Sequence, residues 1–424
     1  MTRQRSVAIL AERSPSYHGE YALEGTEQVQ EGAALVSGFV PAGPVRGGCE
    51  MTARNGFSSR KGRLIGCCIA AALVVAALFA SSASAAKTPL TPTNYTALGD
   101  SLAFGYTAEK FNNNYPAESP SAFEEGYTNF LVKKLAKAEK QAGNALNLIN
   151  LGCPGEVSDG MIGENPSLGG GGEGNGKSDA SPCDYHKKGF PLHFNYGAPP
   201  SQLEAAIGIV TAPGTFGATK YVTENIGSND ELAVVAACST PEYLEAHGFA
   251  GGAFECLIHE AGEEGYYYKG GLFKHIITNL GTAVGVLRNF GYTGPVAVLG
   301  FYNPQAFILP GSDALQKKLN EAAECAIEAK TRTCTVEPKA GETLTIPGQE
   351  KFGPNVVYAN PFSKFNPQKS KTEKKAIEKF TEECNPNVQK FQTGADPGCE
   401  GDIHPTVTGY KQLAKILFEA FAKI

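Results

Sequence analysis

The sequence has no tryptophan, only 3 methionines and no surplus of positive charge. Without tryptophan, the aromatic side chain that most often stacks on sugar rings is missing from any carbohydrate-binding surface. Lys and Arg total 37 against 43 Asp and Glu, so the formal net charge is −6. Because proteins that neutralise phosphates need an excess of cationic side chains, this balance argues against nucleic acid as a partner. A hydrophobic content of 42% with 19% charged residues also excludes wholesale disorder.

A stretch with the pattern of a secretory signal peptide lies well inside the chain. A basic cluster at residues 60–63 precedes an uncharged apolar run over residues 64–80, and Ala83-Ser84-Ala85 then provides the small residues of a cleavage site. We predict a signal peptide over residues 59–85, preceded by an extension, residues 1–58, that is disordered or lies upstream of the true start. An uncleaved membrane anchor is the alternative, since 17 apolar residues are near the lower limit for crossing a bilayer. Cleavage would make the protein secreted, extracellular or part of the cell envelope, where transient contact with a membrane is expected.

Eight of the 11 cysteines follow this segment. An even number of cysteines in an exported chain indicates disulfides. No Cys-x-x-Cys pair or Cys/His run at zinc spacing occurs, so we expect no metal site. We predict pairing between cysteines that are neighbours in sequence: Cys153–Cys183, Cys238–Cys256, Cys325–Cys334 and Cys384–Cys399.

From residue 88 onward, strand-like apolar runs alternate with helix-like runs, which indicates a parallel sheet covered on both faces. The predicted strands are Tyr95–Leu98, Leu146–Leu151, Tyr221–Ile226, Pro295–Phe301 and Asn355–Ala359. The predicted helices are Asn129–Gln141, Ser201–Val210, Leu272–Phe290, Ala314–Lys330, Thr372–Glu383 and Val407–Ile424.

Two segments interrupt this alternation. Residues 160–200 are rich in glycine and lack any period, and residues 238–271 carry aromatic side chains between two cysteines. Structureless insertions of this length are usually functional loops or lids. We predict one domain over residues 88–424 with two loop insertions.

A serine follows the first predicted strand in the tetrapeptide Gly99-Asp100-Ser101-Leu102. Glycine permits a sharp turn here, and the carboxyl end of a strand is where open α/β sheets place their ligands. Asp100 and Ser101 are also good helix caps, so the tetrapeptide alone does not establish a catalytic serine.

Three further blocks follow in order along the chain. They are Gly152-Cys153-Pro154-Gly155-Glu156, Gly227-Ser228-Asn229-Asp230 and Gly401-Asp402-Ile403-His404-Pro405. Together with the serine block, this order resembles the SGNH (GDSL) hydrolase family, and particularly its secreted bacterial lipases and esterases. The resemblance covers most of residues 88–424, and it implies a flavodoxin-like three-layer α/β/α sandwich with about five parallel strands.

Carried over to this sequence, the resemblance implies a role for each block. Ser101 would be the nucleophile and His404 its general base, because a serine hydroxyl is weakly nucleophilic until a neighbouring base accepts its proton. The backbone N–H groups of Ser101 and Gly155, with the side-chain amide of Asn229, would form the oxyanion hole.

The acid partner of the histidine departs from the family pattern. The family usually has an aspartate three residues before the histidine, and Gly401 occupies that position here. Asp402 could orient His404 instead, and the carbonyl of Gly401 is the alternative acceptor. We favour Asp402 as the third catalytic residue.

The resemblance therefore implies a secreted serine hydrolase that cleaves small-molecule or lipid carboxylic esters through an acyl-serine intermediate. No organic cofactor and no metal are implied. A carbohydrate O-deacetylase using the same site is one alternative. A non-catalytic envelope binding protein of the same fold is another.

Overall fold

The computed structural model describes residues 89–163, 183–196, 201–304, 306, 311–328, 333–348, 352–368, 370–383 and 402–424. Residues 1–58 and the predicted signal peptide lie outside this part of the chain, as does the predicted pair Cys384–Cys399. Among the helices of the described residues, none is long and apolar enough to cross a membrane.

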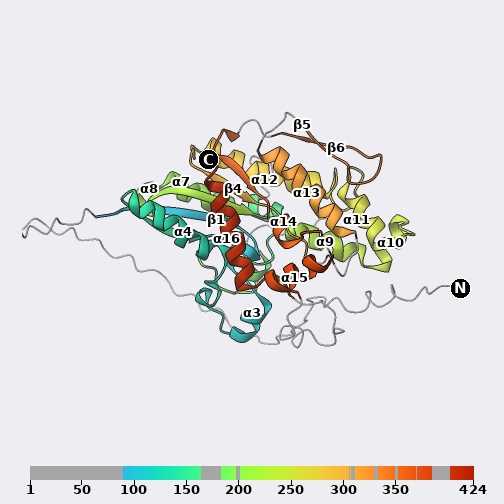
Figure 1. The fold of residues 1–424 in the computed structure, drawn as a ribbon, viewed down its shortest axis with the longest axis horizontal. Helices are drawn as coiled ribbons and strands as arrows, with labels where there is room; N and C mark the ends of the chain where they lie inside the picture. Colours follow the sequence, from blue (N-terminus) through green and yellow to red (C-terminus); the bar gives the residue numbers. More distant parts are fainter. Residues whose placement is uncertain are drawn as a thin grey trace, which may run out of the picture. The chain divides into compact units, whose positions relative to one another are not determined.

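Five parallel strands form the central sheet, in the order β2-β1-β3-β4-β7 (Figure 1). This confirms the predicted flavodoxin-like sandwich. The order reverses direction between β1 and β3, and such a switch point opens a crevice at the carboxyl ends of the two strands. The strands are β1 (Thr91–Gly99), β2 (Asn144–Asn150), β3 (Ala218–Asn225), β4 (Val296–Leu299) and β7 (Val356–Ala359).

Helices cover both faces of the sheet (Figure 1). On one face, α4 (Tyr127–Gln141) and α16 (Val407–Phe421) pack over side chains such as Tyr95 and Ala97. On the other face, α7 (Gln202–Thr211), α12 (Leu272–Asn289) and α13 (Ser312–Ile327) pack over side chains such as Leu98. Because successive strand residues point to opposite faces, β1 contributes to both apolar cores and is buried along most of its length.

The second insertion is not a structureless loop, which corrects the prediction. Residues 238–271 contain the short helices α10 (Pro241–His247) and α11 (Ala253–Ala261), and α9 (Ser228–Cys238) ends where the insertion begins. Thr240 caps α10 with Pro241 in the first turn, a strong local start signal. Helices this short span only two turns or so, and their apolar period is therefore hard to recognise in sequence.

The helix predicted over Thr372–Glu383 also ends differently. Helix α15 (Ser370–Phe380) stops early, and Thr381–Glu382 form strand β8, which pairs antiparallel with β9 (Asp402–Pro405). A partner strand from distant sequence thus overrides local helix propensity. The remaining elements are α2 (Ser101–Phe104), α3 (Ala108–Asn114), η1 (Pro120–Phe123), α5 (Ser158–Ile162), α6 (Asp184–Lys187), α8 (Pro213–Phe216), α14 (Phe362–Phe365), and the hairpin strands β5 (Thr333–Val336) and β6 (Leu344–Pro347).

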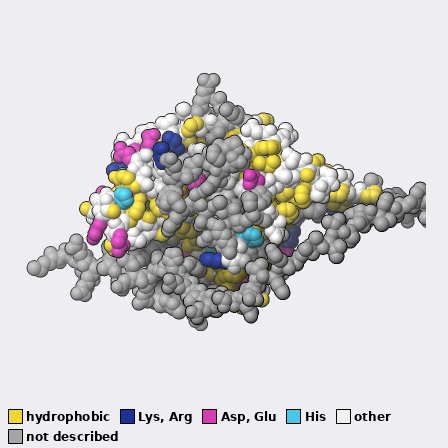
Figure 2. Space-filling model, turned by 180° about the vertical axis from the view of Figure 1, so that it is seen from behind, with side chains coloured by type: hydrophobic (Ala, Val, Ile, Leu, Met, Phe, Trp, Pro, Cys, Tyr) yellow, Lys and Arg dark blue, Asp and Glu magenta, His cyan; other side chains and the backbone are white. Residues whose placement is uncertain are grey.

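Three of the four predicted disulfides lie in the described part of the chain, and all three are present. Cys153–Cys183 ties the first insertion to the loop after β2, Cys238–Cys256 joins α11 to the end of α9, and Cys325–Cys334 joins α13 to β5. Figure 2 shows the face opposite to that of Figure 1, where charged side chains of both signs lie in small separate groups among apolar and uncharged ones.

Candidate active site

The backbone turns sharply where β1 ends. Gly99 has a φ of +147°, and an added Cβ would lie 2.4 Å from the carbonyl oxygen of Asn225. Only glycine tolerates both this conformation and this close approach of two backbones. Asp100 then caps α2, because its carboxylate accepts the backbone N–H of Leu102 at 2.9 Å. Ser101 therefore begins a helix at the carboxyl edge of the sheet, beside the switch point between β1 and β3.

Ser101, His404 and Asp402 form a chain of hydrogen bonds. The Nε2 atom of His404 lies 2.8 Å from Oγ of Ser101, and its Nδ1 atom is hydrogen-bonded to Oδ1 of Asp402. A proton on Nδ1 leaves Nε2 free to accept the serine hydroxyl hydrogen. The His404 side chain is 14% exposed and that of Asp402 only 4%, so the imidazole is accessible while its partner is shielded from water. Gly401, the alternative acceptor, lies outside the described residues.

The Asp402 carboxylate is itself fixed. Its Oδ2 atom accepts the backbone N–H of Ala108 at 2.6 Å, at the start of α3, and its Oδ1 atom also accepts the backbone N–H of His404 at 3.2 Å. The hydroxyl of Tyr302 donates to the carbonyl of Ile403 at 2.9 Å and so holds β9 in place between the two side chains.

Electrostatic interactions shift the pKa values of the groups in and beside this chain of hydrogen bonds. Burial lowers the pKa of the His404 imidazole, but the carboxylates of Asp402 and Asp100 outweigh it, so the pKa is raised above 6.5. Burial raises the pKa of Asp402, and the interaction with His404 outweighs that effect and leaves it below its ordinary value. For Asp100, burial raises the pKa to about 6 even though the N–H groups of Leu102 and Asn225 stabilise the carboxylate. The neighbouring carboxylates thus stabilise the protonated form of His404 relative to that of a free imidazole.

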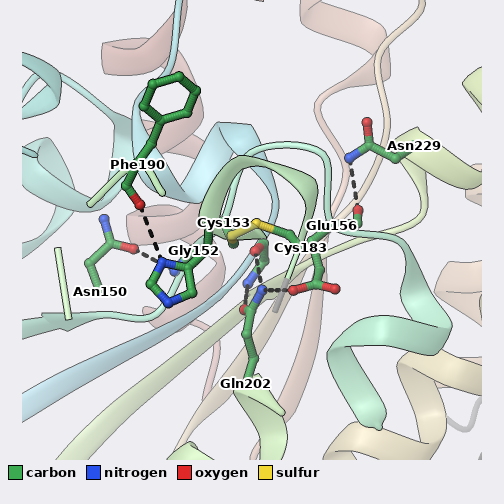
Figure 3. Close-up of a disulfide and its surroundings, with 10 residues drawn as sticks. Asn150, Gly152, Cys153, Glu156, Cys183, Phe190, Gln202 and Asn229 are labelled. Atoms are coloured by element: carbon green, nitrogen blue, oxygen red, sulfur yellow. Dashed lines mark hydrogen bonds between the residues drawn. A yellow bond between two sulfur atoms is a disulfide. The ribbon is translucent and has the colours of Figure 1, made fainter. Parts of the chain in front are cut away.

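The two predicted oxyanion donors other than Ser101 lie on adjoining segments. Gly155 adopts a φ of +81° in the turn after Pro154, and Asn229 lies in the first turn of α9, directly beyond β3. The Asn229 side-chain amide donates to the carbonyl of Glu156 at 2.8 Å, as Figure 3 shows. One hydrogen of that amide is engaged by this bond, and the second can serve another acceptor.

Gln202 ties the Gly155 segment to the end of β1, a role that the sequence did not reveal. Its amide accepts the backbone N–H of Gly99 and donates to the Gly99 carbonyl, both at 2.9 Å. The same amide donates to the Glu156 carboxylate at 2.9 Å (Figure 3). The backbone N–H of Cys153 donates to Gly99 as well, at 3.0 Å. Gln202 follows a helix cap and carries no motif, so only its contacts identify it.

Two other observations concern the surroundings of the site. The ring of Tyr106 lies against His404, with centroids 4.8 Å apart. Among the described residues, Cys153, Glu156 and Cys183 have the mutual spacing of metal ligands. The two sulfurs are joined in a disulfide, however, and offer no thiolate to an ion.

Comparison with known proteins yields only distant likenesses. No family model and no curated protein matches the sequence. A carbohydrate esterase family 2 enzyme from Corynascus thermopiles (Myceliophthora fergusii) overlaps 79% of this chain and 67% of its own, at 13% identity and a TM-score of 0.38. A GDSL-like lipase from Parabacteroides merdae overlaps 79% and 98%, at 12% identity and a TM-score of 0.36. The esterase EstA from a Pseudoalteromonas species overlaps 78% and 97%, at 14% identity and a TM-score of 0.33. Likenesses this distant assign no activity to the chain.

Proposed function

We propose that this chain is a serine hydrolase of the SGNH kind that cleaves carboxylic esters. The observation that carries the proposal is the hydrogen-bonded chain Ser101–His404–Asp402 at the carboxyl edge of the sheet. A nucleophile within reach of a base, with the base oriented by a third group, is the arrangement that activates a serine hydroxyl.

In this mechanism Nε2 of His404 accepts the proton as Oγ of Ser101 attacks the ester carbonyl carbon. The carbonyl π electrons move to the oxygen, and Asp402 stabilises the imidazolium that forms. When the tetrahedral intermediate collapses, the bond to the alcohol oxygen breaks and His404 returns the proton to the leaving alkoxide. A water molecule then attacks the acyl-serine with His404 again as base, which releases the carboxylic acid and regenerates Ser101.

The negative oxygen of the tetrahedral intermediate would be stabilised by the N–H groups of Ser101 and Gly155 and by the Asn229 amide. Donors held in place before the reaction stabilise this charge without reorganising during it. The bonds of Gln202 to Gly99 and of Asn229 to Glu156 provide such preorganisation.

We further propose that the protein is exported and acts as a lipase or esterase on small-molecule or lipid esters. The disulfides are consistent with an oxidising compartment. Sequencing of the exported protein's N-terminus should find a start near Ala86. Retention of residues 59–85 in a membrane fraction would instead favour the uncleaved anchor.

The decisive experiment combines labelling with turnover. A fluorophosphonate should label Ser101 alone, and Ser101→Ala should abolish both labelling and hydrolysis of p-nitrophenyl acetate and butyrate while leaving the melting temperature unchanged. Ser121→Ala, at an exposed surface position, is the matched control and should behave as wild type. A wild-type protein without labelling or turnover would favour the binding-protein alternative. Acetyl release from sugars but not from simple esters would favour the O-deacetylase.

A further inference from the structure

A buried polar cluster that the proposed mechanism does not use lies behind the two oxyanion segments. It consists of Ser158 and Asp159 in α5, Asp230 in α9, and His275 and Asn279 in α12. Ser158 and Asp230 are 0% exposed and Asn279 is 6% exposed. Burying polar groups costs folding free energy unless they are fully hydrogen-bonded. A buried polar network of this kind therefore indicates a structural or functional role.

Ser158 and Asp230 join the two segments that carry the oxyanion donors. The backbone N–H of Ser158 donates to Oδ2 of Asp230 at 2.9 Å, and its hydroxyl donates to Oδ1 at 2.7 Å. Asp230 directly follows Asn229, and Ser158 lies three residues after Gly155. The pair therefore connects the turn of Gly155 to the first turn of α9.

A second bond closes the connection into a ring. Asn229 donates to the carbonyl of Glu156, the residue after Gly155 (Figure 3). With the two bonds between Ser158 and Asp230, three hydrogen bonds now span a gap between segments of only a few residues each. A short closed ring of this kind restricts the separation of the Gly155 N–H and the Asn229 amide more tightly than any single bond could.

Helix α12 supports the ring from behind. The Asn279 amide donates to Oγ of Ser158 and to Oδ1 of Asp159, both at 2.8 Å. Nε2 of His275 lies 3.4 Å from Asp159 and 3.5 Å from Asp230, and the ring of Tyr268 stacks on the imidazole with centroids 4.1 Å apart. The carboxylates of Asp159 and Asp230 thus both have neighbours on a long, well-packed helix. This helix fixes the ring of hydrogen bonds relative to the core.

We propose that Ser158 and Asn279 are positioning residues that set the geometry of the oxyanion hole through Asp230. This inference rests on the proposed ester hydrolysis. Oxyanion donors act only when they lie about 2.7–3.1 Å from the developing charge, and a displacement of about 1 Å can cost on the order of a hundredfold in rate. The network contacts no reacting atom itself, and it positions the Gly155 N–H and the Asn229 amide, which would contact the oxyanion.

The test is a double-mutant cycle between Ser158→Ala and Asn229→Ala, with rates normalised to active sites titrated by fluorophosphonate. Ser158→Ala alone should lower kcat about tenfold with little change in KM, as for displaced positioning groups. In the Asn229→Ala background, the same substitution should lower kcat less than about twofold, because the donor that it positions is gone. Thr93→Val removes a buried hydroxyl from the amino-terminal half of β1 and should leave kcat unchanged.

Equal losses in both backgrounds, or a wild-type kcat per active site in Ser158→Ala, would overturn the proposal. If Ser158→Ala does not fold, Asn279→Ala takes its place in the cycle. That variant keeps the bonds between Ser158 and Asp230 and removes the Asn279 amide bonds to Ser158 and Asp159, and it must show the same dependence on Asn229. Failure of the proposed function would look different, since wild-type protein would then neither turn over esters nor react with fluorophosphonate.

Discussion

At the scale of single residues, the position of the acid is explained by the extended backbone of β9. Asp402 and His404 are two residues apart in this strand, and alternate strand residues face the same side. The two-residue spacing therefore brings the carboxylate to Nδ1 of the imidazole, and no aspartate at position 401 is needed. The strand conformation comes from pairing with β8, which contributes Thr381 opposite Pro405.

The raised pKa of His404 makes a prediction about pH. The imidazole must be neutral to accept a proton, and the carboxylates of Asp402 and Asp100 stabilise its charged form. In wild type, kcat/KM should therefore rise with pH through an inflection above 6.5. Asp402→Asn should move this inflection to lower pH and lower kcat by about a thousandfold or more, since the tautomer is no longer enforced. Profiles with p-nitrophenyl acetate, at pH values where both proteins stay folded, would measure this. An unmoved inflection would count against Asp402 as the acid partner.

Removal of the Asn229 amide should affect catalysis more than binding. We expect Asn229→Ala to lower kcat by about a hundredfold to a thousandfold with a much smaller change in KM, because the donor acts mainly in the transition state. Steady-state kinetics of both parameters test this. The control is Asn355→Ala, which loses an exposed hydrogen bond from the Asn355 side-chain amide to the carbonyl of Thr293. A raised KM at constant kcat would make Asn229 a substrate contact instead.

At the scale of elements, the candidate site combines residues of α2, α9 and β9 with the turn of Gly155, and one disulfide adjoins that turn. Cys153 belongs to the segment that bonds to Gly99, and its partner Cys183 begins the described part of the first insertion after residue 163. Cys325–Cys334 lies elsewhere, between α13 and the hairpin of β5 and β6. The two disulfides close loops of different length, 30 and 9 residues of separation.

This difference predicts unequal costs of removal. By loop-closure entropy, Cys153→Ala with Cys183→Ala should cost about 3.6 kcal/mol of unfolding free energy, and Cys325→Ala with Cys334→Ala about 2.6 kcal/mol. Guanidinium unfolding of the two double variants measures both. Only the first should also lower kcat, since only that disulfide adjoins the Gly155 segment. Equal losses of activity would show that both act through global stability alone.

At the scale of the whole molecule, one buried acid opposes the stability of the fold. Glu224 lies in β3 between Leu98 and Val298 of the neighbouring strands, and it is 1% exposed. Within the described residues, neither of its carboxyl oxygens has a hydrogen-bond partner. Burial therefore raises its pKa well above 4.5, which favours the neutral acid in the folded protein.

Glu224 should make stability depend on pH in a definite direction. Above the unfolded pKa of about 4.5, the unfolded chain releases this proton while the folded chain retains it. Wild-type stability should therefore fall by about 1.4 kcal/mol per pH unit from this group until its folded pKa is reached. Glu224→Gln lacks the titration, so its stability relative to wild type should increase from pH 5 to pH 8. Urea unfolding across this range measures the difference, with exposed Glu419→Gln as control. A constant difference would contradict the assignment.

Sequence pattern alone predicted much of the sheet, whereas the roles of the candidate site residues rested on the family resemblance. The strands followed from apolar runs between turn residues, and the disulfides in the described part joined cysteines that are neighbours in sequence. Both are local features. The short helices α10 and α11 and the hairpin of β5 and β6 were missed, because elements of one or two turns, or of four residues, leave too weak a period.

By itself, the sequence determined the layered α/β architecture and indicated Ser101 and His404 as candidate site residues. Periodicity and motifs such as Gly99-Asp100-Ser101 depend only on residues that are close together in sequence. Only the tertiary structure brought these two side chains together across 303 positions and chose Asp402 as the partner of His404. It alone revealed Gln202 and the cluster around Asp230, whose members come from three separate elements. The physical reason is that hydrogen bonds form between atoms that folding brings close, and separation along the chain does not encode that proximity.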